Sequence, residues 1–257
     1  MIAALGSSGR YRSGASTPAG PQRWRRSLAV VAMLAVLGAC VDPPPPLEEP
    51  DDYGAIEELD LPELAAESLL RRSQEVTVRI RTLGCRQFGV GSGFVLPGGI
   101  VVTNRHVVDE PREVTVNTWD GRTIEAEVSG LAVDSDLAIL QLADDAGLPE
   151  AELRTTPIEP GEQIIAVGYP GGGPATASSG TALGLVDGEL FGEPADVIQI
   201  DADIRQGNSG GPVLDTEGRV IGVVFALDAS TGLGFAVPVT TLLERLDTEN
   251  LTPPAGC

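Results

Sequence analysis

From about residue 74 onward, apolar and polar residues alternate in short runs separated by turn residues. The run EVTVRIRT alternates with a period of two, the spacing of a half-buried β-strand, and parts of EVTVNTW and TIEAEVSGLAV do the same. Further short apolar runs follow along the chain: GSGFVL, IVVTN, EQIIAVGYP, TALGLV, VIQIDADI, GPVLD, RVIGVVFAL and GLGFAVPV. The tripeptide Pro97-Gly98-Gly99 between two of these runs predicts a hairpin turn.

A polar, proline-containing stretch at about residues 144–161 divides the runs into two sets of comparable size. We therefore expect an all-β protein with two small β-barrels in tandem, one at about 74–150 and the other at about 160–245. The sequence TTLLERLD near the C-terminus has helical spacing and predicts a short helix there. A second short helix is expected around Ile56 to Leu70.

Composition agrees with a β-rich fold that has many turns. The 257 residues include 32 Gly and 20 Pro, and 42% of them are apolar, which is ample for a packed core. Aromatic residues make up only 4% of the chain, so the core must consist mostly of Val, Leu, Ile and Ala.

Charge is distributed unevenly along the chain. All 17 basic residues are Arg, and five of them precede residue 40, where no acidic residue occurs. From Cys40 onward, 12 Arg stand against 37 acidic residues, which gives a net charge of −25. Because such an acidic surface repels phosphate backbones, the sequence argues against a nucleic-acid partner.

The basic N-terminus resembles an export signal. RWRRS is followed by the apolar run Leu28 to Ala39, which is shorter than the roughly 20 residues of a membrane-spanning helix. The run ends in LGAC, which resembles the cleavage site of bacterial lipoproteins, so residues 1–39 are expected to be removed and Cys40 to carry lipid. An ordinary cleaved signal with an incidental cysteine is the alternative. Arg25-Arg26 leaves twin-arginine export open beside the general route.

Residues 40–73 have the composition of a spacer. Four consecutive prolines stiffen this segment, like charges extend it, and its apolar content is too low for a core. Together with the lipid anchor, it is expected to hold the rest of the chain at the outer face of the bacterial cell membrane, in the cell envelope or periplasm.

A single histidine, His106 in TNRHVV, limits the chemistry available to the chain. One histidine excludes most zinc sites, so no metal or other cofactor is expected. The stretch RQGNSGGPV places three glycines and a proline around Ser209, which is typical either of an ordinary tight turn or of a turn that presents a nucleophile. A serine nucleophile needs a base, and His106 would have to be that base because no other histidine exists.

The acid that would orient this histidine has two candidates in DSDLAILQL. Asp136 opens a strongly apolar run, Leu137 to Leu142, where an unpaired carboxylate would be costly to bury. We therefore favour Asp136 over Asp134, which lies two positions earlier. A turn residue at the end of a strand is the non-catalytic interpretation of Asp136.

Five motifs and their order along the chain resemble those of the chymotrypsin-fold serine proteases and, within them, of the HtrA-like branch. They are GSGFVL, TNRHVV, DSDLAIL, GYPGGG and DADIRQGNSGGPV. The resemblance covers about residues 76–240 and implies two six-stranded antiparallel β-barrels, a short C-terminal helix and a serine endopeptidase that cleaves polypeptide substrates. It implies that His106 is the general base, Asp136 its orienting acid and Ser209 the nucleophile. The backbone N–H groups of Gly207 and Ser209 would form the oxyanion hole.

A finer resemblance is to the membrane-tethered acid-resistance serine proteases of mycobacteria. It is carried by QGNSGGP, by the GYPGGG turn, and by a cysteine before the first barrel hairpin with another near the C-terminus. With Cys40 lipidated, an even pair of cysteines is left in an oxidising compartment. The resemblance implies that Cys85 and Cys257 form a disulfide, and two free thiols are the alternative.

Three further features of the sequence bear on regulation and specificity. Only 48 residues follow Ser209, so a PDZ domain, and with it PDZ-based substrate selection and trimer caging, is not expected; the oligomeric state is left open. Asn208 occupies the position of an aspartate that pairs with a newly freed amino terminus in digestive proteases, so that activation route is not expected. Asp203 lies at the offset of the trypsin specificity acid and would favour Arg or Lys before the cleaved bond. Alternatively, Asp203 faces solvent or pairs with Arg205.

The leading hypothesis is therefore an extracytoplasmic, lipid-anchored serine endopeptidase. The alternative is a catalytically silent protease-fold lipoprotein that binds or scaffolds other molecules. A nucleotide-binding protein is not supported, because GYPGGGP lacks the Lys and the Ser or Thr of a phosphate-binding loop.

Overall fold

The computed structural model describes residues 63–85, 88–144, 147–191, 193, 195–246 and 251–255. These residues form twelve strands, two α-helices and four short 3₁₀ helices. The predicted signal sequence, Cys40 and most of the predicted spacer lie outside the described residues. Within the described part, no helix is long and apolar enough to cross a membrane.

The first barrel closes in the order β1-β2-β3-β6-β5-β4, and all its neighbouring strands are antiparallel. Its elements are β1 (Thr77–Gly84), β2 (Phe88–Leu96), β3 (Ile100–Asn104), η1 (Arg105–Val107), β4 (Pro111–Asn117), β5 (Thr123–Ala132), η2 (Val133–Ser135) and β6 (Leu137–Leu142).

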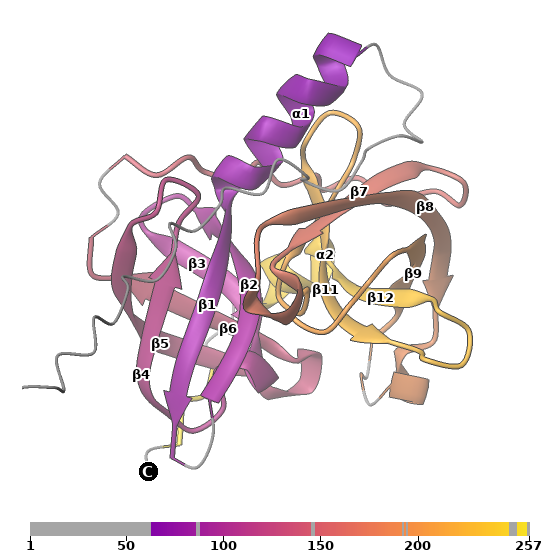
Figure 1. Cartoon of the computed structure of the whole chain (residues 1–257). Helices are drawn as coiled ribbons and strands as arrows, with labels where there is room; N and C mark the ends of the chain where they lie inside the picture. The colour runs from indigo at the N-terminus through magenta and orange to yellow at the C-terminus, as the bar shows by residue number, and fades with distance from the viewer. Residues whose placement is uncertain are drawn as a thin grey trace, which may run out of the picture. The chain divides into compact units, whose positions relative to one another are not determined.

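The second barrel closes in the order β10-β11-β12-β9-β8-β7, again with antiparallel neighbours. Its elements are β7 (Gln163–Gly168), η3 (Pro170–Gly172), β8 (Thr176–Val186), η4 (Gly188–Phe191), β9 (Val197–Ala202), β10 (Pro212–Leu214), β11 (Val220–Leu227) and β12 (Gly234–Pro238). The two barrels lie side by side (Figure 1). The prediction of two six-stranded antiparallel barrels is confirmed.

Strand β1 shows how the alternating pattern builds a barrel. Val78 and Ile80 point into the first barrel and are fully buried, whereas Arg79 and Arg81 point outward from the same strand. The hairpin between β2 and β3 turns at Gly98 and Gly99, whose φ angles of 80° and 71° favour glycine, as the sequence predicts.

A larger apolar cluster contains residues from both barrels and both helices. It includes Phe94 and Phe235, the two largest side chains that are fully buried, together with Leu69 of helix α1 (Glu63–Val76) and Leu242 of helix α2 (Val239–Leu246). Aliphatic residues make up nearly all the rest of this cluster, as the low aromatic content requires.

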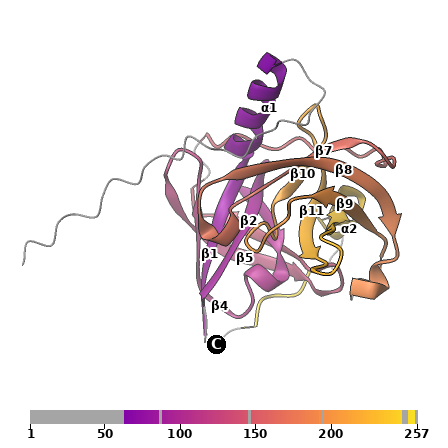
Figure 2. The same ribbon diagram turned by 45° about the vertical axis from the view of Figure 1, so that its right-hand side comes forward.

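Helix α1 corrects the predicted boundaries at the N-terminal side. The sequence suggests a helix around 56–70 within a spacer that ends at residue 73, but α1 continues to Val76 and leads directly into β1, as Figure 2 shows. Leu69, Ser73 and Val76 are buried at spacings of four and three residues, which is one face of a helix. Packing of this face therefore extends the folded part of the chain back into the predicted spacer.

Two features complete the C-terminal side. The predicted C-terminal helix is confirmed as α2. Beyond it, Thr252 returns to the first barrel, where it and Leu131 of β5 exchange two backbone hydrogen bonds of 2.9 and 2.8 Å. A β-carbon on Gly130 would lie 2.6 Å from the β-carbon of Leu251, so the absence of a side chain there admits this segment.

Candidate active site

Asp136 lies at the junction of η2 and β6, in a left-handed conformation with φ 43° and ψ 32°. Asp tolerates this region better than most residues with a β-carbon. Its backbone oxygen accepts hydrogen bonds from the Arg105 amide at 2.9 Å and from Asn104 Nδ2 at 3.0 Å. These contacts fix the turn against the end of β3, so the carboxylate of Asp136 faces the residues that follow that strand.

His106 lies in η1, directly after β3, and forms hydrogen bonds with both carboxylate oxygens of Asp136. Its backbone amide donates to Asp136 Oδ1 at 3.1 Å, and its ring Nδ1 lies 2.6 Å from Asp136 Oδ2. The carboxylate is almost enclosed, with 12% of the side chain exposed, whereas the His106 side chain is 46% exposed. Because Nδ1 is engaged, Nε2 is the ring nitrogen left for a reacting group.

Asp134 does not share this arrangement. Its carboxylate pairs with Arg245 of α2 at 3.0 Å, and 56% of its side chain is exposed. Of the two acids considered from the sequence, the structure brings only Asp136 into contact with His106.

Ser209 comes from the other barrel, in the loop before β10. Gly210, with φ 85°, closes the loop behind it; a β-carbon there would lie 2.2 Å from the Ser92 oxygen and 3.0 Å from the Asn104 nitrogen. Only glycine therefore lets the loop approach the end of β3, where the turn that carries His106 begins. The backbone oxygen of Ser209 accepts a 2.8 Å hydrogen bond from Ser92 of β2.

Gly91 of β2 provides a second close approach between the turn that carries His106 and the loop that carries Ser209. A β-carbon on Gly91 would lie 2.6 Å from a methyl group of Val107, the neighbour of His106, and 3.1 Å from the Ser209 oxygen. The described residues contain no hydrogen bond between the Ser209 hydroxyl and His106. Such bonds are often long before a substrate binds and tighten during the reaction.

In the loop that carries Ser209, here called the serine loop, backbone amides with and without a hydrogen-bond acceptor alternate. The amides of Asn208, Gly210 and Gly211 donate to backbone oxygens at 3.0, 2.7 and 2.9 Å. Those of Gly207 and Ser209 have no acceptor anywhere in the part of the chain that the structure describes. Two unpaired amides flanking a satisfied one are available to donate hydrogen bonds to a bound oxygen atom.

The structure places Asp203 at the surface. An acid at the base of a specificity pocket would be enclosed, but 60% of the Asp203 side chain is exposed and its carboxylate pairs with the Arg205 guanidinium. Arg205, two residues along, pairs with this carboxylate at the surface, so the described contacts do not support the pocket assignment. The alternative considered from the sequence is the arrangement observed.

Of the cysteines, Cys85 alone lies among the described residues. It is part of a disulfide, while Cys40 and Cys257 both lie outside them, so pairing of Cys85 with Cys257 stays a prediction. Among the described residues, no group of three or more His, Cys, Asp or Glu side chains could hold a metal ion.

Sequence reasoning missed Glu193, a buried acid near the His–Asp pair. Its residue is 7% exposed. Burial, the largest cause, and the negative charges of Asp136 and Asp134 together raise the pKa of Glu193 to about 7, against the lowering effect of Arg105 and Arg245. The loop sequence around it carries no motif, so only the folded arrangement brings it to this place.

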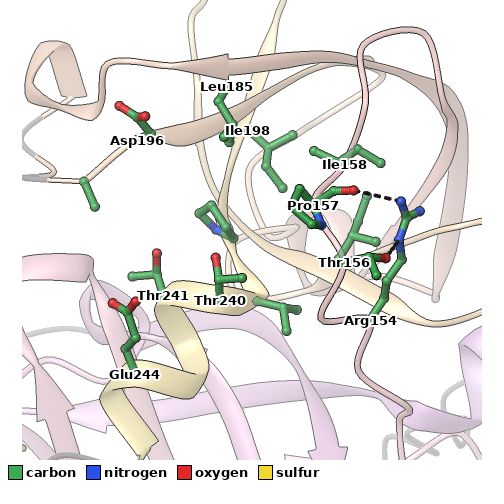
Figure 3. A pocket seen from close by; sticks show the side chains of 14 residues that line it. Arg154, Thr156, Pro157, Ile158, Leu185, Asp196, Ile198, Thr240, Thr241 and Glu244 are labelled. Atoms are coloured by element: carbon green, nitrogen blue, oxygen red, sulfur yellow. Dashed lines mark hydrogen bonds between the residues drawn. The ribbon is translucent and has the colours of Figure 1, made fainter.

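A separate pocket of about 270 Å³ lies on the second barrel (Figure 3). Leu185 and Ile198 contribute apolar walls, Thr240 and Thr241 come from the start of α2, and the Arg154 guanidinium turns toward the Pro157 oxygen at 3.0 Å. None of the residues of the predicted triad lines this pocket.

Two closed six-stranded barrels, with a His–Asp pair on one and a glycine-flanked serine on the other, define the chymotrypsin-like class of serine protease folds. Residues 91–223, more than half of the chain, match the family of trypsin-like peptidase domains, and the chain belongs to that family. Its relatives and structural neighbours include HtrA-type proteases, which confirms the resemblance seen in the sequence.

Among curated relatives, putative serine protease HhoB of Synechocystis is 42% identical over 164 residues, which cover 61% of this chain and 39% of that protein. Serine protease Rv3671c of Mycobacterium tuberculosis is 34% identical over 209 residues, covering 76% of this chain and 51% of that protein. The chain therefore spans about two fifths to one half of the length of these relatives.

Solved structures of serine proteases are also similar to this chain. The active form of the Rv3671c protease from M. tuberculosis has a TM-score of 0.67 and 32% identity, covering 76% of this chain and 90% of that chain. The HtrA-type protease AlgW with a tripeptide has a TM-score of 0.66 and 30% identity, covering 70% of this chain and 62% of that chain.

Proposed function

We propose that the protein is an extracytoplasmic, lipid-anchored serine endopeptidase. In this proposal Ser209 is the nucleophile, His106 the general base and Asp136 the acid that orients it. The 2.6 Å contact between His106 Nδ1 and Asp136 Oδ2 carries the proposal. A buried carboxylate at this nitrogen selects the tautomer with Nε2 free to accept a proton and stabilises the imidazolium that forms.

The reaction follows from these positions. As the Ser209 oxygen bonds to the substrate carbonyl carbon, its proton passes to His106 Nε2 and the carbonyl oxygen becomes an anion. The unpaired amides of Gly207 and Ser209 donate to this anion; each such donor contributes roughly 3–4 kcal/mol to the transition state. The C–N bond then breaks as the imidazolium protonates the leaving amine. Water hydrolyses the acyl-enzyme with the same histidine as base.

A fluorophosphonate probe tests the proposal against a silent scaffold. The purified protein is expected to be labelled covalently and to cleave an unstructured polypeptide, and Ser209→Ala is expected to do neither. A wild-type protein that is folded but neither labelled nor active would favour the binding or scaffolding alternative. The physiological substrates can then be sought by comparing protein N-termini in cells that carry the active enzyme or the Ser209→Ala variant.

The anchor and the location rest on the N-terminal sequence and on relatives such as the periplasmic endoprotease DegQ of Escherichia coli. We place the lipid on Cys40 as the first residue of the mature chain. Two or more acyl chains give stable membrane attachment, whereas one is marginal. Intact-mass analysis of the membrane fraction should show an acylated chain beginning at Cys40. A Cys40→Ser variant that still resists a carbonate wash would contradict this assignment.

The proposed disulfide joins Cys85 to Cys257. It would close a loop that spans nearly the whole peptidase domain, for which chain entropy predicts a stabilisation of about 5 kcal/mol. Peptide mapping without reduction should recover the two cysteines in one linked fragment. A free thiol at Cys257 in protein taken from the cell envelope would exclude the pairing.

A further inference from the structure

The orientation of one peptide unit decides whether Gly207 can serve the oxyanion. The oxygen of Gln206 accepts a 2.8 Å hydrogen bond from the Gly171 amide in η3. In a trans peptide the C=O and N–H groups point in opposite directions. The bond from Gly171 therefore turns the Gly207 N–H away from η3, where it has no acceptor among the described residues. If this peptide rotated, the site would present an oxygen in place of a donor.

Nothing in the local sequence prevents that rotation. Gly207 has φ 102°, a region in which glycine moves freely, and η3 contains Gly171 and Gly172 at φ 61° and 74°. Glycine-rich turns of this kind lose much conformational freedom when they are held in one form. The two segments are in direct contact, since a β-carbon on Gly207 would lie 2.5 Å from the Tyr169 oxygen. The position of η3 thus determines the position of the Gln206 oxygen.

Arg79 of β1 holds η3 from the opposite side. Its Nη1 donates to the backbone oxygens of Gly172 at 2.9 Å and Gly173 at 3.4 Å. The guanidinium also lies over the Tyr169 ring, 5.7 Å from its centre. Hydrogen bonds to neutral acceptors are stronger when the donor is charged. One side chain therefore contacts both ends of the turn that supplies the Gly171 amide.

The barrel itself fixes the direction of this arginine. Asn117 stands opposite Arg79 on β4, and its Oδ1 accepts bonds of 3.4 Å from both Nε and Nη2. Ser92 stands opposite on β2, donates its hydroxyl proton to the Gly207 oxygen at 2.7 Å and accepts from the Tyr169 amide at 2.9 Å. Neighbouring positions on three strands thus hold both η3 and the serine loop.

We propose that Arg79 is a positioning residue for the oxyanion hole, acting through η3 and the Gln206 oxygen to keep the Gly207 amide available. The inference rests on the proposed protease function. The side-chain contacts of Arg79 are to Asn117, to η3 and to Tyr169, and none is to the predicted triad, so its removal should impair the chemical step and leave substrate binding nearly intact.

Arg79→Met keeps the apolar stem of the side chain and removes the hydrogen-bond donors. Loss of one oxyanion donor lowers kcat by roughly 100- to 1000-fold. Because this variant would only release the peptide to rotate, we expect kcat to fall by about 10- to 100-fold with KM within about twofold. Arg79→Lys retains a charged donor without the planar fork and should recover part of the loss. The thermal midpoint should stay within a few degrees of the wild type.

Arg81→Met is the matched control. Arg81 lies two residues along the same strand with an exposed side chain, and no hydrogen bond or ion pair joins that side chain to any described residue. It should keep wild-type kcat. If Arg79→Met does not fold, Asn117→Ala replaces it; loss of this acceptor should lower kcat by about two- to fivefold.

A readout without turnover separates this inference from the proposed function. The ¹⁵N–¹H resonance of Gly207, recorded in the Ser209→Ala background, should shift or broaden in Arg79→Met and stay unchanged in Arg81→Met. An unchanged Gly207 resonance, or equal kcat in Arg79→Met and wild type, would overturn the inference. A wild-type protein without activity, together with a shifted resonance, would count against the protease function alone.

Discussion

Replacing Glu193 by Gln is expected to stabilise the folded protein above pH 7 and to have little effect below pH 4.5. Glu193 is 7% exposed, and burial raises the pKa of its carboxyl from 4.5 to about 7. Four charged groups act on it: Asp136, Asp134, Arg105 and Arg245. Gln has the same shape and stays neutral at every pH, so the substitution removes the ionisation and keeps the packing.

The direction of the pH effect on stability follows because the pKa of Glu193 is higher in the folded protein than in the unfolded chain. Below pH 4.5 both states are protonated, and the carboxyl contributes no penalty. Between pH 4.5 and 7 the unfolded chain releases a proton that the folded chain retains, so stability falls as pH rises, and above pH 7 the loss is complete. One pKa unit corresponds to about 1.4 kcal/mol, which sets an upper limit of about 3 kcal/mol. Solvent screening reduces the expected gain to about 1–2 kcal/mol.

Urea unfolding of Glu193→Gln at several values between about pH 4 and pH 8 measures this effect, with Ser209→Ala as the parent to prevent self-cleavage. Glu189→Gln is the control, because Glu189 is an exposed acid on the neighbouring helix η4. The gain in unfolding free energy should appear across pH 4.5–7 for Glu193→Gln alone. A gain that is independent of pH, or a loss above pH 7, would refute the reasoning.

Other substitutions test the site directly. His106→Ala and Ser209→Ala should each abolish peptidase activity, and the double variant should be no worse than either, because the two residues act as one unit; residual rates on a peptide substrate measure this. Asp136→Asn should lower kcat by about 10⁴-fold at unchanged fold, measured by the same assay and by circular dichroism. A larger loss in Asp134→Asn would reverse the assignment of the acid. Gly210→Ala should unfold at a clearly lower temperature, since its β-carbon would lie 2.2 Å from a backbone oxygen; an unchanged thermal midpoint would contradict that.

The two barrels were predictable because strands depend on local patterns. Period-two alternation marks the strands, and one histidine leaves one base. The contact of His106 with Asp136 depends on their order along the chain and on a resemblance that spans both barrels. The structure adds the register that joins β3 to β6 and brings the two residues within 2.6 Å.

The features that sequence reasoning missed depend on tertiary contacts. Arg79 follows the ordinary outward pattern of a strand, and only the folded chain brings it to the oxygens of Gly172 and Gly173. Glu193 is acidic in a polar loop, and only packing buries it. For Asp203, a fixed offset from Ser209 says nothing of Arg205, which pairs with its carboxylate at the surface.

The return of Thr252 to β5 affects how the molecule is made. Leu131 and Thr252 are 121 residues apart, and their pairing joins the second half of the chain back onto the first barrel. A chain still being synthesised has a first barrel without this partner. Pairings of such long sequence separation form late and slow folding. The N-terminal half, which carries His106, would therefore wait for the segment at 251–252 before this stretch of β5 is covered, so the candidate site would be completed only late in synthesis.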